Sequence, residues 1–177
     1  MPGASAPREP GLASGVGPLP TFRMQPLPHT HSCFVCGESN PLGLNLRFHT
    51  DGRMVRVEFQ PRPEHAGFKH TVHGGIISTV LDEIMVWACA VQTKQFGFCA
   101  EMTVRFQQPL RPGETAVATA ELVANRKNRI FEARAELRDA ANTLLATATG
   151  KYLPIKATDL TGLMADMVSE PGMFELR

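Results

Sequence analysis

Two kinds of chemically useful group lie close together near the middle of the chain. His73-Gly74-Gly75 opens an apolar stretch that carries two adjacent carboxylates, Asp82 and Glu83. Glycines offer no side-chain cap, so we expect the first backbone N–H groups of this stretch to be free to meet a negatively charged atom. A buried, unpaired carboxylate costs several kcal/mol, so Asp82 and Glu83 require a partner or a function. N–H donors followed by a carboxylate are a combination that can do chemistry.

These groups need an element that holds them, and the spacing of the apolar residues predicts a helix. They recur at intervals of three and four over residues 76–91, at Ile77, Val80, Leu81, Ile84, Trp87, Ala88 and Val91. The stretch is apolar almost all round, which is typical of a helix buried on more than one side.

Length and composition place the chain in an ordinary class. Its 177 residues suit one domain, and a net charge of +1 gives no reason to expect a nucleic acid or an anionic membrane as partner. We find no apolar run near the ~18 residues of a membrane span and no secretory signal. The four cysteines do not suggest a disulfide framework, so we expect a reducing, cytoplasmic location.

The strand pattern surrounds the predicted helix. Residues 1–30 are rich in Pro and Gly and predict a flexible leader, residues 31–155 a folded domain, and residues 156–177 a tail with a short helix around 158–168. Strands are expected at 44–49, 54–59, 98–106, 115–124, 130–137 and 143–152, with turns between them. In 98–106 we expect Phe98 and Met102 on one face and Cys99 on the other. The order β-β-α-β-β-β-β predicts an α+β fold whose antiparallel meander wraps one long central helix.

Cys33-x-x-Cys36 admits two interpretations. With His29 or His31 nearby, the pair could bind zinc, yet a closed site needs four ligands. A glycine-rich turn with two small, half-buried thiols is the simpler interpretation, and we expect no metal.

The sequence resembles the hotdog-fold acyl-CoA thioesterases, in the branch similar to phenylacetyl-CoA and 4-hydroxybenzoyl-CoA thioesterases. The likeness covers roughly residues 33–153. It rests on Cys33-Phe-Val-Cys-Gly with Asn-Pro-Leu-Gly-Leu at 40–44, on His73-Gly-Gly through Asp82-Glu83, and on the Glu-Met-Thr-Val-Arg-Phe run at 101–106 with Pro109 and Pro112.

The resemblance implies roles for individual residues. Asp82 matches the catalytic base or nucleophile, the N–H of Gly74 polarises the thioester carbonyl, and the position of Cys99, commonly Ser or Thr, lies near the reacting centre. His73 and Gly75 complete the catalytic motif. In the family, the loop before the helix commonly carries Asn or Gln, which positions the water, at the place where this chain has Gly67. Either His65 or His70 takes over that role here, or no side chain does.

Other residues have competing interpretations as substrate-binding or structural groups. Glu83 could contact the substrate, but a structural role bonding a loop or a partner chain is favoured. Arg126 and Lys127 could bind the phosphates of coenzyme A, or they could form an ordinary solvated hairpin.

Helix geometry bears on assembly. Gly74 and Asp82 are eight residues apart, so one straight helix separates them by about 12 Å. One carbonyl group cannot touch both, and a shared site therefore requires Asp82 from a second copy. We expect a homodimer, or a homotetramer built from it.

The sequence predicts an acyl-CoA thioesterase that needs no metal or redox cofactor. Two alternatives remain. A hydratase or dehydratase of the same fold would carry a Gly-Asp-x-Asn-Pro-x-His signature, which this sequence lacks. A non-catalytic acyl-CoA-binding protein would fit the glycine at position 67.

Overall fold

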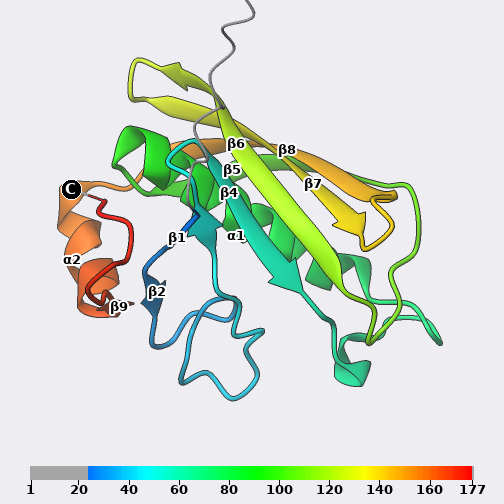
Figure 1. Ribbon diagram of the computed structural model, residues 1–177. Helices are drawn as coiled ribbons and strands as arrows, with labels where there is room; N and C mark the ends of the chain where they lie inside the picture. The colour runs from blue at the N-terminus through cyan, green and yellow to red at the C-terminus, as the bar shows by residue number, and fades with distance from the viewer. Residues whose placement is uncertain (1–23, 177) are drawn as a thin grey trace, which may run out of the picture.

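The computed structural model describes residues 24–176 and centres on one helix, α1 (Gly74–Thr93) (Figure 1). The elements before it are β1 (Gln25–Pro26), β2 (His29–Thr30), β3 (His49–Thr50), β4 (Met54–Phe59) and the 3-10 helix η1 (Pro63–His65). Those after it are β5 (Gly97–Phe106), β6 (Ala116–Arg126), β7 (Ile130–Asp139), β8 (Leu144–Pro154), α2 (Ala157–Ala165) and β9 (Met167–Val168).

A seven-stranded antiparallel sheet curves around α1 in the order β1-β3-β4-β6-β7-β8-β5. The helix packs on β4, β5, β6, β7 and β8, so its apolar surface meets the sheet over most of its length. Inward residues alternate along the strands, as at Phe131, Ala133, Ala135 and Leu137 of β7, each at most 2% exposed. The predicted α+β architecture, one long helix wrapped by antiparallel strands, is confirmed.

By length and composition alone, α1 could cross a membrane, contrary to our count of apolar runs. In the structure, apolar residues of this helix are buried in the protein core. Trp87, Leu81 and Ile84 are at most 2% exposed within the core, where Trp87 packs edge-on to Phe96 and also contacts Phe48. The hydrophobic surface of α1 is therefore covered by the protein's own sheet.

The predicted meander is wrong at one connection. The hairpins β6–β7 and β7–β8 form as expected. Lys127 and Asn128 both take positive φ in the tight turn between β6 and β7. β5, however, pairs with β8 rather than β6. Residues 107–115 carry the chain across the sheet from β5 to β6, so β5 is an edge strand whose second side is unpaired among the described residues.

Two further strand predictions need correction. Residues 44–49 do not form a strand, because Asn45 has a φ of 52° that breaks the extended backbone, and only His49–Thr50 pairs. In β5, the register shifts between Cys99 and Glu101. This bulge reverses the alternation, so Cys99 shares the inner face with Met102 instead of opposing it.

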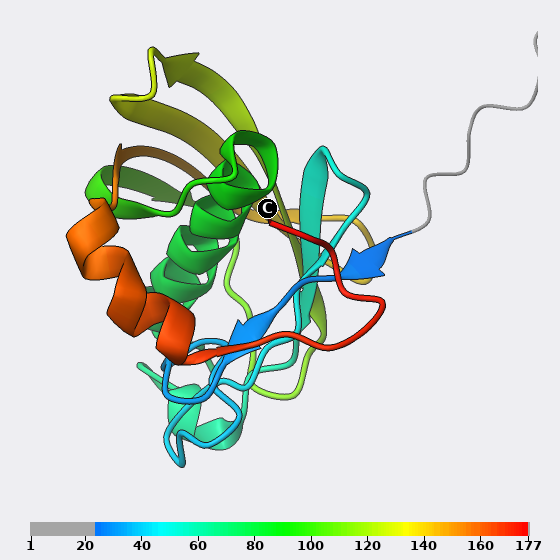
Figure 2. The same cartoon turned by 90° about the vertical axis from the view of Figure 1, so that its left-hand side faces the viewer.

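The chain before residue 31 is partly structured, which corrects the predicted leader boundary. β1 pairs with β3, Leu27 is 1% exposed, and β2 pairs with β9 from the C-terminal tail. Figure 2 shows the segment that follows α2 running beside the N-terminal strands. The predicted C-terminal helix is present as α2, but it ends at Ala165, and residues 167–168 form β9 instead. The rest of the predicted leader, residues 1–23, lies outside the described residues.

Candidate active site

The N-terminus of α1 presents one backbone N–H group to its surroundings. His73 caps the helix, since its Nδ1 accepts a hydrogen bond of 2.8 Å from the N–H of Gly75. This corrects our expectation of an uncapped helix. The N–H groups of Ile76 and Ile77 bond to the carbonyl of His73, whereas the Gly74 N–H has no acceptor within the described chain. Gly74 therefore holds the free donor, and the capping Nδ1 of His73 must be unprotonated.

A cavity of about 550 Å³ opens beside this donor. Its walls come from the loop before α1, the first turn of α1 and the segment after β5. They are formed by Gly67, Phe68, Thr71, Val72, His73, Gly74, Ile77, Phe106, Gln107, Gln108, Pro109 and Leu110. The volume is that of a typical small-molecule site, and the wall is mainly apolar.

Two of the glycines at the cavity stand where other side chains approach closely. A Cβ on Gly67 would lie 3.0–3.1 Å from atoms of His73, and a Cβ on Gly74 would lie 3.2 Å from Cζ of Phe106. A larger residue at position 67 would displace the side chain that caps the helix. Gly67 is therefore explained by its close packing against His73. A glycine also has no side chain that could position a water at this place.

The carboxylate of Asp82 lies in a second cluster, about two turns further along the helix. Its Oδ1 accepts a 2.9 Å hydrogen bond from the hydroxyl of Tyr152 on β8. Tyr152 is fully buried, and burial followed by the charge of Asp82 raises the pKa of its phenol far above the usual range. The phenol is therefore protonated at physiological pH and donates to Asp82.

Cys99 joins this cluster because of the β5 bulge, which pairs it with Tyr152 across the strands. Desolvation, with the charge of Asp82 adding to it, raises the pKa of Cys99 to about 11. The side chain is therefore a neutral thiol at physiological pH. Sequence reasoning placed Cys99 near the reacting centre but on the wrong face of its strand, and it missed Tyr152.

Glu83 does not line the cavity, which argues against its predicted role in substrate binding. One of its oxygens accepts a 3.1 Å hydrogen bond from Nε1 of Trp87 and lies 3.8 Å from Sγ of Cys33. Desolvation, reinforced by the nearby Cys33, raises the pKa of Glu83 to about 8. The two adjacent carboxylates thus face different environments.

The loop histidines are separated as well. His65 is 7% exposed, stacks on Phe59 and accepts a hydrogen bond from the N–H of Arg62. Burial, and then the charge of Arg62, lowers its pKa. His70 lines a different cavity, with Pro63, Ala66, Arg111 and Pro112. Neither side chain belongs to the cavity beside Gly74, so neither is placed to position a water there.

Arg126 and Lys127 lie at the end of the β6–β7 hairpin. The guanidinium of Arg126 forms an ion pair with Glu132 across the hairpin, and Lys127 occupies the turn. Neither residue lines the cavity beside Gly74. The ion pair favours the structural interpretation for Arg126.

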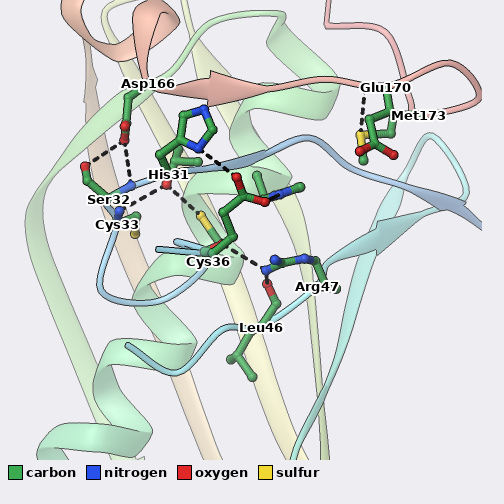
Figure 3. A network of polar contacts seen from close by, with 12 residues as sticks. His31, Ser32, Cys33, Cys36, Leu46, Arg47, Asp166, Glu170 and Met173 are labelled. Carbon is green, nitrogen blue, oxygen red and sulfur yellow. Dashed lines mark hydrogen bonds and ion pairs between the residues drawn. The ribbon is translucent and has the colours of Figure 1, made fainter. Parts of the chain in front are cut away.

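The Cys-x-x-Cys segment forms a glycine turn, as expected, but it also meets a third potential ligand. Figure 3 shows this segment beside His31, Asp166 and Arg47. The ligand atoms of Cys33, Cys36 and Glu83 all lie within 4.8 Å of one another. The histidines considered from the sequence, His29 and His31, instead bond to Glu38.

The family model of the thioesterase superfamily matches residues 69–146. No curated protein matches the chain. The crystal structure of a thioesterase superfamily protein is 23% identical and covers 70% of this chain, which spans only 60% of that protein, with a TM-score of 0.64.

Two other solved structures are similar. The PaaI protein of the Escherichia coli phenylacetic acid degradation operon is 21% identical, with 64% of this chain and 81% of that chain covered and a TM-score of 0.58. A Streptococcus mutans protein with bound acetyl CoA is 16% identical, with 58% and 81% covered and a TM-score of 0.54. These solved structures show that the chain has the hotdog fold, and residues 69–146 are similar to the thioesterase superfamily.

Proposed function

We propose that the protein hydrolyses acyl-CoA thioesters to a free acid and coenzyme A. The observation that carries this proposal is the free N–H of Gly74 at an apolar cavity, on the same helix as a carboxylate oriented by Tyr152. Hydrolysis requires a donor for the carbonyl oxygen and a base or nucleophile for the carbonyl carbon, and these groups supply both.

The reaction can be written from these groups. In the general-base form, Asp82 takes a proton from water as the water oxygen bonds to the carbonyl carbon. The resulting oxyanion is stabilised by the Gly74 N–H and the positive end of the helix dipole. Collapse of this intermediate breaks the C–S bond, and the departing thiolate takes the proton. In the nucleophilic form, Asp82 attacks the carbonyl carbon and expels the coenzyme A thiolate, and water then hydrolyses the mixed anhydride to restore the carboxylate and release the acid.

The separation of the two groups favours a two-fold dimer. Gly74 lies beside Phe106, at the end of β5, whereas Asp82 lies near Cys99, close to its start. Antiparallel pairing of two β5 edges with Cys99 of one copy opposite Phe106 of the other would bring Gly74 of each copy toward Asp82 of its partner. Phe98 and Phe106 are 61% and 53% exposed on this strand, apolar surface that such a dimer could cover. We therefore propose an isologous homodimer with two equivalent sites; pairing of two dimers into a tetramer stays a prediction.

The cavity and the fold relatives support the proposed substrate class. Phe68, Val72, Phe106 and Leu110 give the cavity an apolar wall suited to an acyl or aryl group. A relative of the same fold was solved with acetyl CoA bound. Lys127 and its hairpin stay candidates for the coenzyme A phosphates. The reaction needs only water as co-reactant, so we propose no cofactor, and we propose a cytoplasmic location because all four cysteines are free thiols.

The direct test is thiol release from a panel of acyl- and aryl-CoA esters, with Asp82→Asn beside the wild type. Asparagine retains an oxygen that can accept from Tyr152 but is neither a base nor a nucleophile. We expect turnover to fall by about 10³-fold or more while the melting temperature stays close to that of the wild type. Full activity in Asp82→Asn would remove the carboxylate from the mechanism.

One alternative has a structural observation in its favour. Gly67 leaves no polar side chain at the loop position where a water would be held, as in a protein that binds acyl-CoA without cleaving it. Tight binding of coenzyme A esters with no thiol release by the wild type would favour that alternative over hydrolysis.

A further inference from the structure

A group of three possible metal ligands lies away from the cavity beside Gly74. Sγ of Cys33, Sγ of Cys36 and a carboxylate oxygen of Glu83 are mutually within 4.8 Å. Cys33 and Glu83 are 50 residues apart in sequence, and their closest S···O distance is 3.8 Å. In a tetrahedron with Zn–S of about 2.3 Å and Zn–O of about 2.1 Å, ligand atoms are separated by about 3.6–3.8 Å. The spacing therefore suits one small ion.

The backbone of the Cys-x-x-Cys turn is built to direct both sulfurs to the same side. The N–H of Val35 donates to Sγ of Cys33 at 3.2 Å, and the N–H of Gly37 closes the turn on the Cys33 carbonyl at 2.9 Å. A Cβ on Gly37 would lie 2.2 Å from that carbonyl oxygen, so only glycine fits. Hydrogen bonds from backbone N–H groups to sulfur are those that stabilise a metal-bound thiolate.

The third ligand is also held in place by a neighbour. Nε1 of Trp87 donates to Oε1 of Glu83 at 3.1 Å, which orients the carboxylate. Cys36 contacts the hydroxyl of Thr30 at 3.6 Å. Metal ligands in proteins commonly have such outer partners, which orient them.

The three side chains of the cluster are of the kind that a bound cation would stabilise in their charged forms. All three side chains can carry a negative charge, and among the described residues no Lys or Arg side chain bonds to any of them. The guanidinium of Arg47 donates to the backbone carbonyls of Cys36 and Leu46 rather than to a ligand atom (Figure 3). All three side chains can therefore be ionised together only when a cation lies among them.

We propose that Cys33, Cys36 and Glu83 bind one divalent transition-metal ion of the zinc type, with a water as the fourth ligand. Thiolate sulfur selects zinc over magnesium or calcium, and Cys33 is partly exposed, so a water can reach the ion. The ion would join the loop after β2 to the middle of α1. It would stabilise the fold next to Asp82 without taking part in hydrolysis, so this proposal does not depend on the proposed function.

The experiment uses the full chain, reduced and stripped of metal with a chelator, and titrated with Zn²⁺ and with Co²⁺. We expect one ion per chain, a rise in melting temperature on Zn²⁺ binding, and thiolate-to-cobalt charge-transfer absorption with Co²⁺. Cys33→Ser and Cys36→Ser should each weaken binding at least 100-fold and reduce that absorption. Glu83→Gln should weaken binding at least tenfold while the thiolate absorption remains.

The matched control is Cys99→Ser, which removes a thiol elsewhere and should bind the ion as the wild type does. Circular dichroism of the metal-free variants shows whether each one folds. The cobalt spectrum of the wild type is decisive even if one of the variants fails to fold. Absence of stoichiometric binding by the reduced wild type would overturn the proposal. So would binding that survives in Cys33→Ser and Cys36→Ser, or a Cys33–Cys36 disulfide whose reduced form binds no ion.

Discussion

The hydroxyl of Tyr152 donates a 2.9 Å hydrogen bond to Oδ1 of Asp82, joining the last long strand to the central helix across 70 residues of sequence. Tyr152 is completely buried, so its hydroxyl has few other acceptors, and it also lies 3.4 Å from the backbone carbonyl of Asp82. A carboxylate proposed to act on a substrate is thereby held in one orientation by a group that stays protonated.

Tyr152→Phe tests whether this contact positions Asp82. The ring remains and only the hydroxyl is lost, so we expect the free energy of unfolding to fall by about 1 kcal/mol. In the thiol-release assay, kcat should fall by about 10- to 100-fold with KM nearly unchanged, because the carboxylate is misplaced while the cavity is intact. A loss of stability with unchanged kcat would assign Tyr152 a structural role only.

Gly150 makes the room that the Tyr152 ring occupies. A Cβ on Gly150 would lie 2.7 Å from Cε2 and 2.8 Å from the hydroxyl oxygen of Tyr152. Gly150→Ala should therefore displace the ring, lower the free energy of unfolding by about 1–3 kcal/mol and reduce kcat as Tyr152→Phe does. The matched control is Gly162→Ala in α2, where a Cβ would have no neighbour within 4 Å. That change should leave kcat unchanged and stabilise the protein slightly, and equal behaviour of the two variants in chemical denaturation would contradict this account.

A site shared between two chains can be tested by complementation. Gly74→Pro removes the free N–H at the first position of α1, where proline suits the helix and the extended His73 precedes it (φ −61°, ψ 132°). Gly74→Pro and Asp82→Asn should each be nearly inactive alone. Refolded together at equal amounts, they should regain about a quarter of wild-type turnover, since about half of the dimers are mixed and each mixed dimer has one intact site.

Gly74→Ala is the control for this experiment, because it keeps the N–H and adds only a methyl group 3.2 Å from the mobile end of Phe106. It should retain most of its activity. Light scattering should give a mass twice the 19.3 kDa of one chain. A monomer, or a mixture that recovers no activity, would contradict the shared site.

The buried His65 predicts a contribution to acid sensitivity. Burial, with the nearby Arg62 adding to it and Glu64 opposing it, lowers the pKa of His65 below its usual 6.5. Between the folded and unfolded pKa values the unfolded chain binds more protons, so stability is present above pH 6.5 and is lost as the pH falls toward the folded value. His65→Asn keeps an acceptor for the N–H of Arg62 without titrating there. In urea denaturation at a series of pH values, its free energy of unfolding should fall less than that of the wild type below pH 6.5, and parallel curves would refute the assignment.

Much of the fold was predictable because its signals are local. The three- and four-residue spacing of Val80, Ile84 and Trp87 depends only on helical periodicity, and all three residues are buried where that period puts them. The alternation in 54–59 likewise predicted β4 to the residue. The pairing of β5 with β8 was missed, because a nine-residue connection with two prolines does not reveal whether it turns or crosses the sheet.

For the candidate site, too, local features were predictable from the sequence, and contacts between distant segments were not. The sequence by itself determined the chemistry of α1, namely a glycine N–H at its start and a carboxylate eight residues later, because both lie on one regular helix. Only the tertiary structure decided what each group meets: the β5 bulge placed Cys99 opposite Tyr152, β8 brought Tyr152 to Asp82, and the loop after β2 brought two thiols to Glu83. Those contacts join segments 17 to 70 residues apart, and their geometry depends on strand order and packing, which local spacing does not encode.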